Sequence, residues 1–391
     1  MPAAQIALAA LATLVALLVA GCSGPSTGAG PTATPGAGTT GQGAAPGTAS
    51  PTHRLGSPAA RAARFEPWTV SAVSAKRIWV LGSVRCAAPP CRAGLYRSFD
   101  GGRSWRRLRL PTMMFRTDPG GAGDGVSGVA FANDTTGWLF GPDLWVTHTG
   151  GLQWRQVPVP GDVKEVAVGS GTAWAMVGAC SPGQGCAALG LMRADLPSTR
   201  FAPVTLPSPL IGGGPVPDLA AAGNTVAVLT NLPPGLPGDH GQVEVSHDQG
   251  KHWVVRPAPC VNELGGTISV SAAATWASCP TGSLANVFVS ERGPFKQVNV
   301  FGGPLPSFTS VTAVERTSAL VSVLGSRVYQ TPDGGRNWRR VFLPPQSRQA
   351  EGMSVSFASR RHGYAVAAGA GGHQLIRTDD GGLHWRAVPL G

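Results

Sequence analysis

An eight-residue motif recurs five times in this chain and constrains its fold more than any other feature. The motif starts with Ser or Thr, has Gly at its fifth position and ends in Trp, and Asp fills the third position in four copies. A repeat of this kind indicates tandem structural units rather than one reaction centre. The copies are defined by Ser98, Asp100, Gly102 and Trp105; Thr147, Gly151 and Trp154; Ser246, Asp248, Gly250 and Trp253; Thr331, Asp333, Gly335 and Trp338; and Thr378, Asp380, Gly382 and Trp385.

The spacing of the motifs predicts seven units. The intervals between successive motif tryptophans are 49, 99, 85 and 47 residues, so two intervals are about twice the others. Each long interval has room for a degenerate copy, and we place these at Ala194–Phe201 and Ser290–Phe295. Residues 68–390 then divide into seven units of ~46 residues, the size of a four-stranded propeller blade.

A second pattern predicts the strands of each unit. Seven times, a short alternating segment such as Val70–Val73 leads into an apolar segment that often opens with Trp, as at Trp79, and a motif follows. Short β-like runs separated by turn residues are typical of all-β proteins, and the 55 Gly and 35 Pro residues supply the turns. The sequence therefore predicts an all-β fold, a seven-bladed β-propeller with four-stranded blades.

The composition of the motif fits the closing of a turn. The Ser/Thr hydroxyl and the Asp carboxylate can accept hydrogen bonds from backbone N–H groups of a hairpin. The Gly permits a positive φ angle, and the Trp can pack against its own hairpin. We therefore expect the motif residues to be structural rather than catalytic.

The five motifs resemble the Asp-box (BNR) repeats of sialidase-like propellers, sortilin-type receptors and photosystem II assembly-factor-like propellers. The resemblance covers residues 68–390 approximately, nearly all of the part expected to fold, and the motif is called the Asp box below. It implies the propeller fold. These families share the box and differ in activity, so the resemblance does not by itself select a function.

The N-terminus predicts export and a lipid anchor. Residues 6–20 are almost wholly apolar, and Val19-Ala20-Gly21-Cys22 resembles a bacterial lipobox, which implies that Cys22 is lipidated. We therefore expect a signal peptide at 1–21, a Gly/Pro/Ala/Thr linker at 22–66 and the propeller at 67–391, on the extracytoplasmic face of a bacterial cell membrane. Because residues 1–5 lack Lys and Arg, an uncleaved anchor is the alternative.

The other six cysteines form three pairs that are close in sequence. Fifteen pairings are available to six cysteines, and the blade layout favours Cys86 with Cys91, Cys180 with Cys186, and Cys260 with Cys279. Unpaired buried thiols are the alternative, which an exported setting disfavours. No His or acidic cluster accompanies any pair, so we expect no metal and no cofactor.

A catalytic interpretation fails at the tyrosines. The resemblance to sialidases would require an arginine triad, a Tyr nucleophile paired with Glu, and an Asp acid/base. All three tyrosines, Tyr96, Tyr329 and Tyr364, occupy positions that the repeat explains, which leaves no nucleophile. A hydrolase would also need two facing carboxylates, and the acids outside the boxes show no recognisable pair. The acids among them that remain possible for such a role are Asp118, Asp124, Asp162, Glu165, Asp218, Asp239 and Glu263.

The expected binding surface is the face that carries the long connections. Connections from the second to the third strand and from blade to blade share this long-loop face, and the Asp boxes share the opposite one, the Asp-box face. The long connections are predicted at 82–94, 111–125, 178–190, 230–241 and 257–266. The segment Met113, Met114, Phe115 and Arg116 is a candidate contact surface, although it could equally pack onto blade 1 or 2. Arg85, Arg92 and Arg116 would add a basic rim.

The net charge of +11 favours anionic partners, such as lipid headgroups, wall phosphates or acidic proteins. No Lys/Arg-rich run suggests nucleic acid. The sequence as a whole predicts a monomeric, non-catalytic propeller that binds a protein or an anionic envelope component, with no catalytic residue. A propeller that binds cell-wall glycans and a diverged sialidase-like glycoside hydrolase are the alternatives.

Overall fold

The computed structural model describes residues 65–390, except for 85–89, 117–124, 182–184, 211–216, 231–239, 262–263, 301–302, 304, 307–308, 324–326, 345–352 and 370–371. The predicted signal peptide, Cys22 and most of the linker lie outside the described residues, as do Arg85 and Cys86. The described residues belong to one compact unit. No helix in the described ranges is long and apolar enough to cross a membrane.

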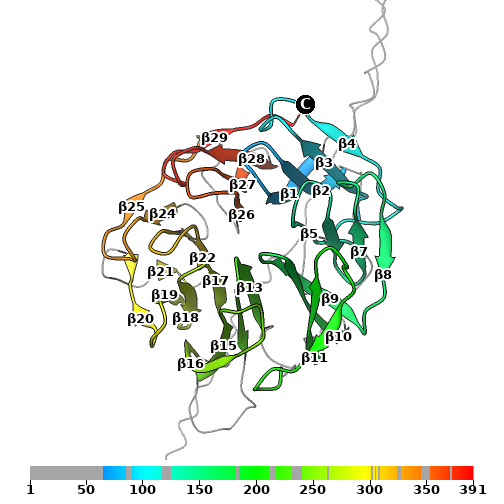
Figure 1. The fold of residues 1–391 in the computed structure, drawn as a ribbon. Coiled ribbons are helices and arrows are strands. Elements are labelled where there is room, and N and C mark those ends of the chain that lie inside the picture. Colours follow the sequence, from blue (N-terminus) through cyan, green and yellow to red (C-terminus); the bar gives the residue numbers. More distant parts are fainter. Residues whose placement is uncertain are drawn as a thin grey trace, which may run out of the picture. The chain divides into compact units, whose positions relative to one another are not determined.

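Seven antiparallel sheets are arranged in a ring, which confirms the predicted seven-bladed propeller (Figure 1). Each sheet contains four strands that are consecutive in the sequence, and neighbouring strands pair in chain order. Blades 1 to 3 comprise β1 (Phe65–Ala72), β2 (Ile78–Val84), β3 (Ala93–Ser98) and β4 (Arg106–Leu108); β5 (Gly128–Phe131), β6 (Gly137–Phe140), β7 (Leu144–Thr147) and β8 (Arg155–Val157); and β9 (Asp162–Val168), β10 (Thr172–Ser181), β11 (Gly185–Asp195) and β12 (Ala202–Val204).

The remaining four blades follow the same plan, and blade 5 has one additional short strand, β21, which pairs with β19. Blades 4 to 7 comprise β13 (Asp218–Ala222), β14 (Thr225–Thr230), β15 (His240–Ser246) and β16 (Val254–Val261); β17 (Thr267–Val270), β18 (Thr275–Pro280), β19 (Leu284–Ser290), β20 (Lys296–Gln297) and β21 (Leu305–Pro306); β22 (Thr309–Ala313), β23 (Ala319–Val323), β24 (Arg327–Thr331) and β25 (Arg339–Arg340); and β26 (Ser354–Phe357), β27 (Gly363–Gly369), β28 (Gly372–Thr378) and β29 (Arg386–Ala387).

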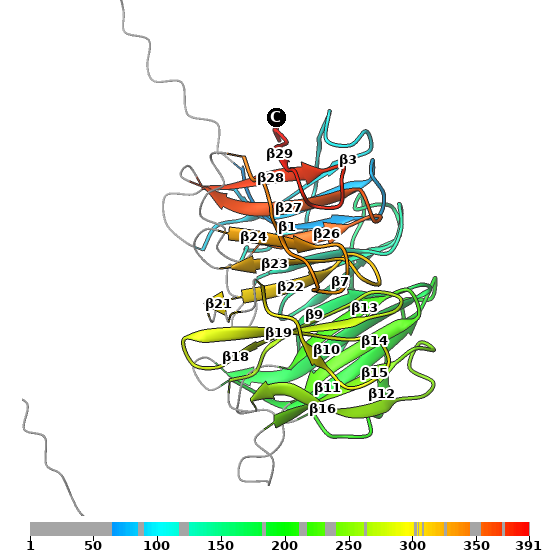
Figure 2. The same ribbon diagram turned by 90° about the vertical axis from the view of Figure 1, so that its left-hand side faces the viewer.

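The ring closes between blades 7 and 1 without an exchanged strand in the described part of the chain. The first strands of the two blades lie side by side (Figure 2). The backbone N–H groups of Val70 and Ala72 donate to the hydroxyls of Ser354 and Ser356 at 3.2 and 3.0 Å. Side chains therefore join the two ends of the ring.

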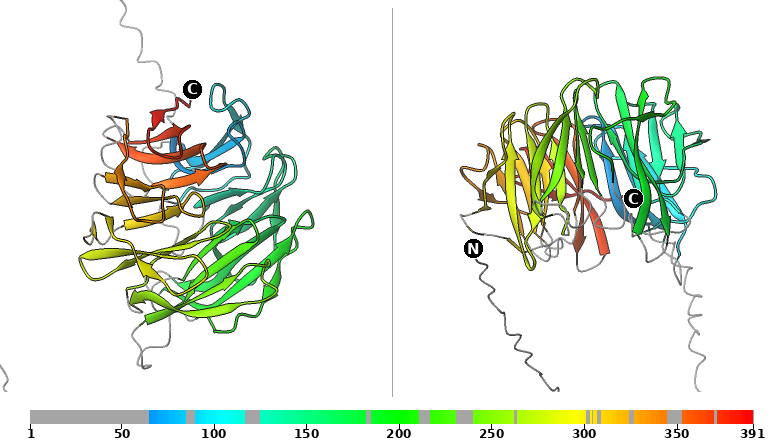
Figure 3. Two further views of the ribbon diagram at one scale, coloured as in Figure 1. Left: turned by 60° about the vertical axis from the view of Figure 1, so that its left-hand side comes forward. Right: turned by 90° about the horizontal axis from the view of Figure 1, so that it is seen from below.

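The core consists of apolar layers between neighbouring blades, which pack face to face around the ring (Figure 3). The aromatic position at or near the start of the second strand contributes the largest buried side chains. Trp79, Trp138, Trp174, Trp276 and Tyr364 are each at most 1% exposed. Burial of this much apolar surface at every interface explains why one aromatic recurs at this position.

The Asp box closes the turn between the third and fourth strands by the expected hydrogen bonds. In blade 1, Gly102 N donates to Ser98 Oγ at 2.8 Å, and the N–H groups of Arg103 and Ser104 donate to Asp100 Oδ1 at 3.0 and 2.9 Å. In blade 2, Thr149 takes the place of Asp and accepts from Gln153 N at 2.9 Å. A hydroxyl thus substitutes for the carboxylate with fewer bonds.

The box glycine also has a role between blades, which the sequence analysis missed. A Cβ atom on Gly250 would lie 2.3 Å from Trp174 in blade 3, and one on Gly102 would lie 2.6 Å from Val388 in blade 7. Both glycines have positive φ angles. Each box is therefore held tightly against the preceding blade, and Gly is required for close approach as well as for the turn.

Two predicted long loops are wholly or partly wrong, and in the one predicted at 257–266 strand β16 continues to Val261. Residues 178–190 belong largely to the β10–β11 hairpin, in which β10 continues to Ser181 and β11 starts at Gly185. The Cα atoms of Cys180 and Cys186 are direct partners across this hairpin. The sequence did not reveal this hairpin because residues 178–190 are mostly Gly, Ala, Ser and Cys and show no strand pattern. Backbone pairing between β10 and β11 extends the sheet there.

Candidate functional site

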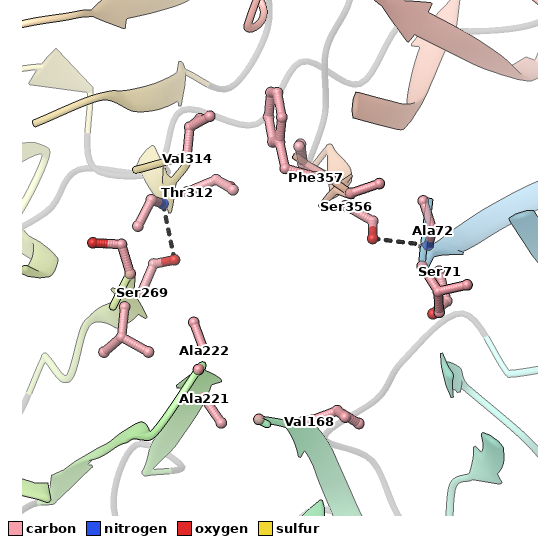
Figure 4. Close-up of a pocket in the computed structure, with 18 of the residues that line it drawn as sticks. Ser71, Ala72, Val168, Ala221, Ala222, Ser269, Thr312, Val314, Ser356 and Phe357 are labelled. Carbon is pink, nitrogen blue, oxygen red and sulfur yellow. Dashed lines mark hydrogen bonds between the residues drawn. The ribbon is translucent and has the colours of Figure 1, made fainter. Parts of the chain in front are cut away.

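A central cavity of about 940 Å³ lies where the first strands of the blades end, on the Asp-box side of the ring. Its walls are mainly small side chains, as Figure 4 shows for Ser71, Ala72, Ala221 and Ser269. A second cavity of about 540 Å³ lies where the first strands begin, and Lys164, Glu165 and Asp218 contribute to it. Arg316 and Lys164 are the only cationic side chains among the described residues that line the two cavities.

Polar side chains of the first strands form hydrogen bonds from blade to blade around these cavities. Ser71 Oγ of blade 1 accepts from Phe131 N of blade 2 at 2.9 Å, and Ser269 Oγ of blade 5 accepts from Ala313 N of blade 6 at 2.9 Å. Figure 4 shows the latter bond, together with the bond between Ser356 and Ala72. Each such bond satisfies an N–H at a strand edge that has no partner strand.

Two carboxyl groups, those of Glu165 and Asp218, also accept hydrogen bonds from backbone N–H groups of the next blade, and the structure places them close together. Glu165 Oε2 accepts from Leu219 N at 3.0 Å, and Asp218 Oδ2 accepts from Ile268 N. The two carboxyl groups also hydrogen-bond to each other. The sequence suggested neither the pair nor its position, because Glu165 and Asp218 are 53 residues apart in the chain.

Burial dominates the ionisation of this pair. Burial raises the pKa of Glu165 well above its usual range, and the nearby Asp218 raises it further. Burial also raises the pKa of Asp218 to about 6, although the N–H of Ile268 partly opposes the shift. Both shifts favour a proton shared between the two carboxyl groups.

This arrangement differs from the carboxylates of glycoside hydrolases. Those enzymes keep their two carboxyl groups roughly 5–10 Å apart, so that the sugar and a water molecule or a nucleophile fit between them. Glu165 and Asp218 bond directly to each other and to the backbone, which leaves no space for a glycosidic bond. Asp118, Asp124, Asp239 and Glu263 lie outside the described residues, and Asp162 lies 3.8 Å from Lys164 Nζ.

The tyrosines are also part of the blade structure. The hydroxyl of Tyr364 in blade 7 donates to the carbonyl of Ala75 in blade 1 at 2.8 Å, and burial raises the pKa of Tyr364. Tyr329 is 7% exposed within the layer between blades 5 and 6. Tyr96 packs on Phe65, with ring centroids 4.5 Å apart. Each tyrosine thus stabilises packing at the place where the repeat predicts it.

The candidate contact segment at residues 113–116 is only partly a surface. Phe115 N donates to Cys91 O and Ala93 N donates to Met113 O, so the segment ties the start of β3 to blade 2. Phe115 is 5% exposed and packs on Trp68, which removes it from the candidate contact surface because its ring completes the core. Met113 packs against the same cluster, Met114 and Arg116 are partly exposed, and Arg92 is exposed.

The long-loop face contains a disulfide with exposed leucines near it. Cys260 and Cys279 form a bond that joins the end of β16 to the second strand of blade 5, and both residues are almost fully buried. Leu264 and Leu284, which follow the two cysteines, are 43% and 42% exposed. Cys91 is also disulfide-bonded. Its expected partner Cys86 and the side chains of Cys180 and Cys186 lie outside the described residues.

Among the described residues, no group of three or more His, Cys, Asp or Glu side chains is placed to hold a metal ion. The box histidines bond within their own turns: His252 Nδ1 and His384 Nδ1 each lie 2.6 Å from the Asp carboxylate of the same box. These contacts stiffen the exposed turns of blades 4 and 7.

No family model matches the sequence, and no curated protein is similar to it in sequence. The structure is similar to that of YCF48 bound to a D1 peptide, with a TM-score of 0.51 and 14% identity over 80% of this chain and 93% of the other. It is also similar to the β-propeller domain of the Trilobed protease from Pyrococcus furiosus, with a TM-score of 0.56 and 5% identity over 83% and 98% of the two chains. A third similar structure is puromycin hydrolase, with a TM-score of 0.57 and 15% identity over 84% and 54%. At these identities the likeness shows the propeller fold alone.

Proposed function

We propose that this protein is an extracytoplasmic lipoprotein whose propeller binds a protein partner and has no catalytic activity. The observation that carries the proposal is the exposure of Leu264 and Leu284, which follow the cysteines of the Cys260–Cys279 disulfide in the chain on the long-loop face. Exposed apolar side chains on a cross-linked surface lose little conformational entropy on binding, which favours association with another protein. The known structure of YCF48, a propeller of similar fold, is of that protein bound to a D1 peptide.

The arrangement of the titratable groups supports a binding role over hydrolysis. The facing carboxylates, Tyr329 and Tyr364 form hydrogen bonds or packing contacts between blades, and Tyr96 packs on Phe65 within blade 1. A glycan-binding role has less support, because the two most exposed phenylalanines in the described ranges, Phe99 and Phe342, lie within an Asp box or against one. Protein binding therefore accounts for more of the surface than either alternative.

Photo-crosslinking from the two faces tests the binding role. We expect benzoylphenylalanine at Leu284, on the long-loop face, to give a discrete crosslinked product in cells that express the chain. Leu152 is the matched control, because it is a leucine of similar exposure, 46%, in the blade 2 Asp box on the opposite face. A product from Leu152 and none from Leu284 would contradict the proposal, as would hydrolysis of a panel of sialosides by the purified chain.

The lipid anchor is tested by replacing Cys22 with Ala. Because the thiol of Cys22 is the proposed acceptor of the lipid, we expect the variant to lose incorporation of labelled palmitate and to leave the membrane fraction. The Cys260→Ala variant is the control, and it should keep the label because its thiol forms a disulfide inside the propeller. If Cys22→Ala stays in the membrane fraction, the uncleaved apolar segment is the anchor instead.

A further inference from the structure

Blade 1 carries a concentration of positive charge that the fold does not require. Residues 65–84 and 90–109 contain eight Lys or Arg side chains and two acidic ones, Glu66 and Asp100. Glu66 bonds to His373 of blade 7, and Asp100 accepts backbone N–H groups of its own box. Both acidic groups of this blade therefore have hydrogen-bond partners other than its arginine side chains. Burial, followed by repulsion from Arg106 and Arg77, lowers the pKa of Arg97, as expected in a crowded basic field.

A cavity of about 510 Å³ lies at the outer edge of this blade and is called the arginine pocket here. Arg92, Arg107 and Arg109 provide its charges, and its apolar lining includes Val84, Leu108, Leu110 and Met113. The pocket exists because β4 pairs with only part of β3. After Leu108 the chain leaves the edge of β3, and it returns at Met113, whose carbonyl accepts from Ala93 N at 3.0 Å.

The three arginines have exposed or accessible side chains and no acidic partner in the described part of the chain. Arg92, Arg107 and Arg109 are all exposed, and no carboxylate of the described residues forms an ion pair with any of them. The outer edge of β4 also has no paired strand in the described ranges. The pocket thus combines unpaired guanidinium groups, an apolar lining and a free strand edge.

Blade 6 shows that the repeat alone does not create this pocket. Arg340 pairs with Tyr329 as Arg107 pairs with Tyr96, so the fourth strands of the two blades correspond in register. The position that matches Arg109 is occupied by Phe342, whose ring stacks on His384 at 4.9 Å. Blade 6 therefore has arginines in its fourth strand, Arg339 and Arg340, but no guanidinium group at the position that matches Arg109.

We propose that the arginine pocket binds an acidic peptide segment, which lies in extended form along the free edge of β4. Guanidinium groups bind carboxylates by two parallel hydrogen bonds, and a free strand edge offers backbone groups to an extended chain. The apolar lining suits the aliphatic parts of a peptide better than a bare phosphate. The inference rests on the proposed protein-binding function and names the chemistry of the partner.

Fluorescence anisotropy tests the inference on the full chain in non-ionic detergent. The probe is a fluorescein-labelled dodecapeptide of alternating Glu and Thr, and its neutral counterpart has Gln in place of Glu. We expect the acidic peptide to bind and Arg107→Glu with Arg109→Glu to weaken it by about tenfold or more. Arg339→Glu with Arg340→Glu in blade 6 is the matched control, and it should change the Kd by less than about twofold because those charges are distant and screened.

Four results would overturn the inference: no binding of the acidic peptide, equal binding of the Gln peptide, equal loss in the blade 6 control, or binding to phosphatidylglycerol vesicles alone that requires Arg107 and Arg109. Thermal unfolding of both variants separates loss of the site from loss of the fold. If the acidic peptide does not bind while Leu284 still gives a crosslinked product, the proposed protein-binding function is retained. Only the assignment of the arginine pocket as an acidic-peptide site is then withdrawn.

Discussion

Replacing Gly335 with Ala is expected to lower the free energy of unfolding by roughly 2–5 kcal/mol, which places it among the most damaging single-atom additions available in this chain. Two costs combine. Gly335 has a φ angle of +84°, which costs an L-residue about 1–2 kcal/mol. The new Cβ would also lie 2.4 Å from Val298 Cβ in blade 5, and such overpacking typically costs about 1–3 kcal/mol.

The adjacent Gly334 provides a matched control within the same box. Its φ angle is +76°, and a Cβ atom there would meet nothing within 4 Å. Gly334→Ala should therefore cost only the backbone term, about 1–2 kcal/mol. Urea unfolding followed by tryptophan fluorescence measures both variants. Equal losses would show that the box glycine serves the turn alone and that its contact with the preceding blade carries no energy.

The sequence predicted the blades well because each unit repeats the same local chemistry. The Asp box shows its turn geometry in its residue types, and the aromatic of the second strand marks a position that is buried in five blades. These signals are local in the chain. Contacts between blades are not, and the close approach of Gly250 to Trp174 could be recognised only when blades 3 and 4 were placed side by side.

The candidate sites were predicted less well for the same reason. Glu165 and Asp218 occupy different positions in their first strands, so the repeat gave no reason to pair them. The sequence placed Phe115 in a loop as a candidate contact residue. Its contact with Trp68 depends on the path of the connection between blades 1 and 2, which the sequence does not show. Arg107 and Arg109 form a local cluster that the sequence does display, although the cavity between them arises from the early end of β4.

Replacing Glu165 with Gln is expected to remove a pH dependence of stability that the raised pKa values predict for the natural chain above about pH 4. The pKa values of Glu165 and Asp218 are raised in the folded state, Asp218 to about 6. The unfolded chain loses these protons near pH 4. Above that pH the folded state holds more protons than the unfolded state, so stability falls as pH rises through the folded pKa values.

The size of the effect follows from the raised pKa of Asp218, a residue that also lines the second cavity. We expect the natural chain to lose on the order of 2 kcal/mol of unfolding free energy between pH 5 and pH 8 through this pair. In Glu165→Gln the amide oxygen can still accept from Leu219 N, and the amide N–H can donate to the ionised Asp218. The variant should match the natural chain at pH 5 and exceed its stability at pH 8 by about 1–2 kcal/mol.

Urea unfolding at pH 5 and pH 8 measures the difference between the variant and the natural chain, which cancels the titration of the shared histidines. Glu291→Gln is the control, because Glu291 forms an exposed ion pair with Arg316 at 3.2 Å. Removing that pair should change stability by less than about 1 kcal/mol at either pH. If Glu165→Gln instead destabilises the chain equally at both pH values, the carboxyl pair does not share a proton, and Glu165 is held as an ordinary ionised acceptor between the blades.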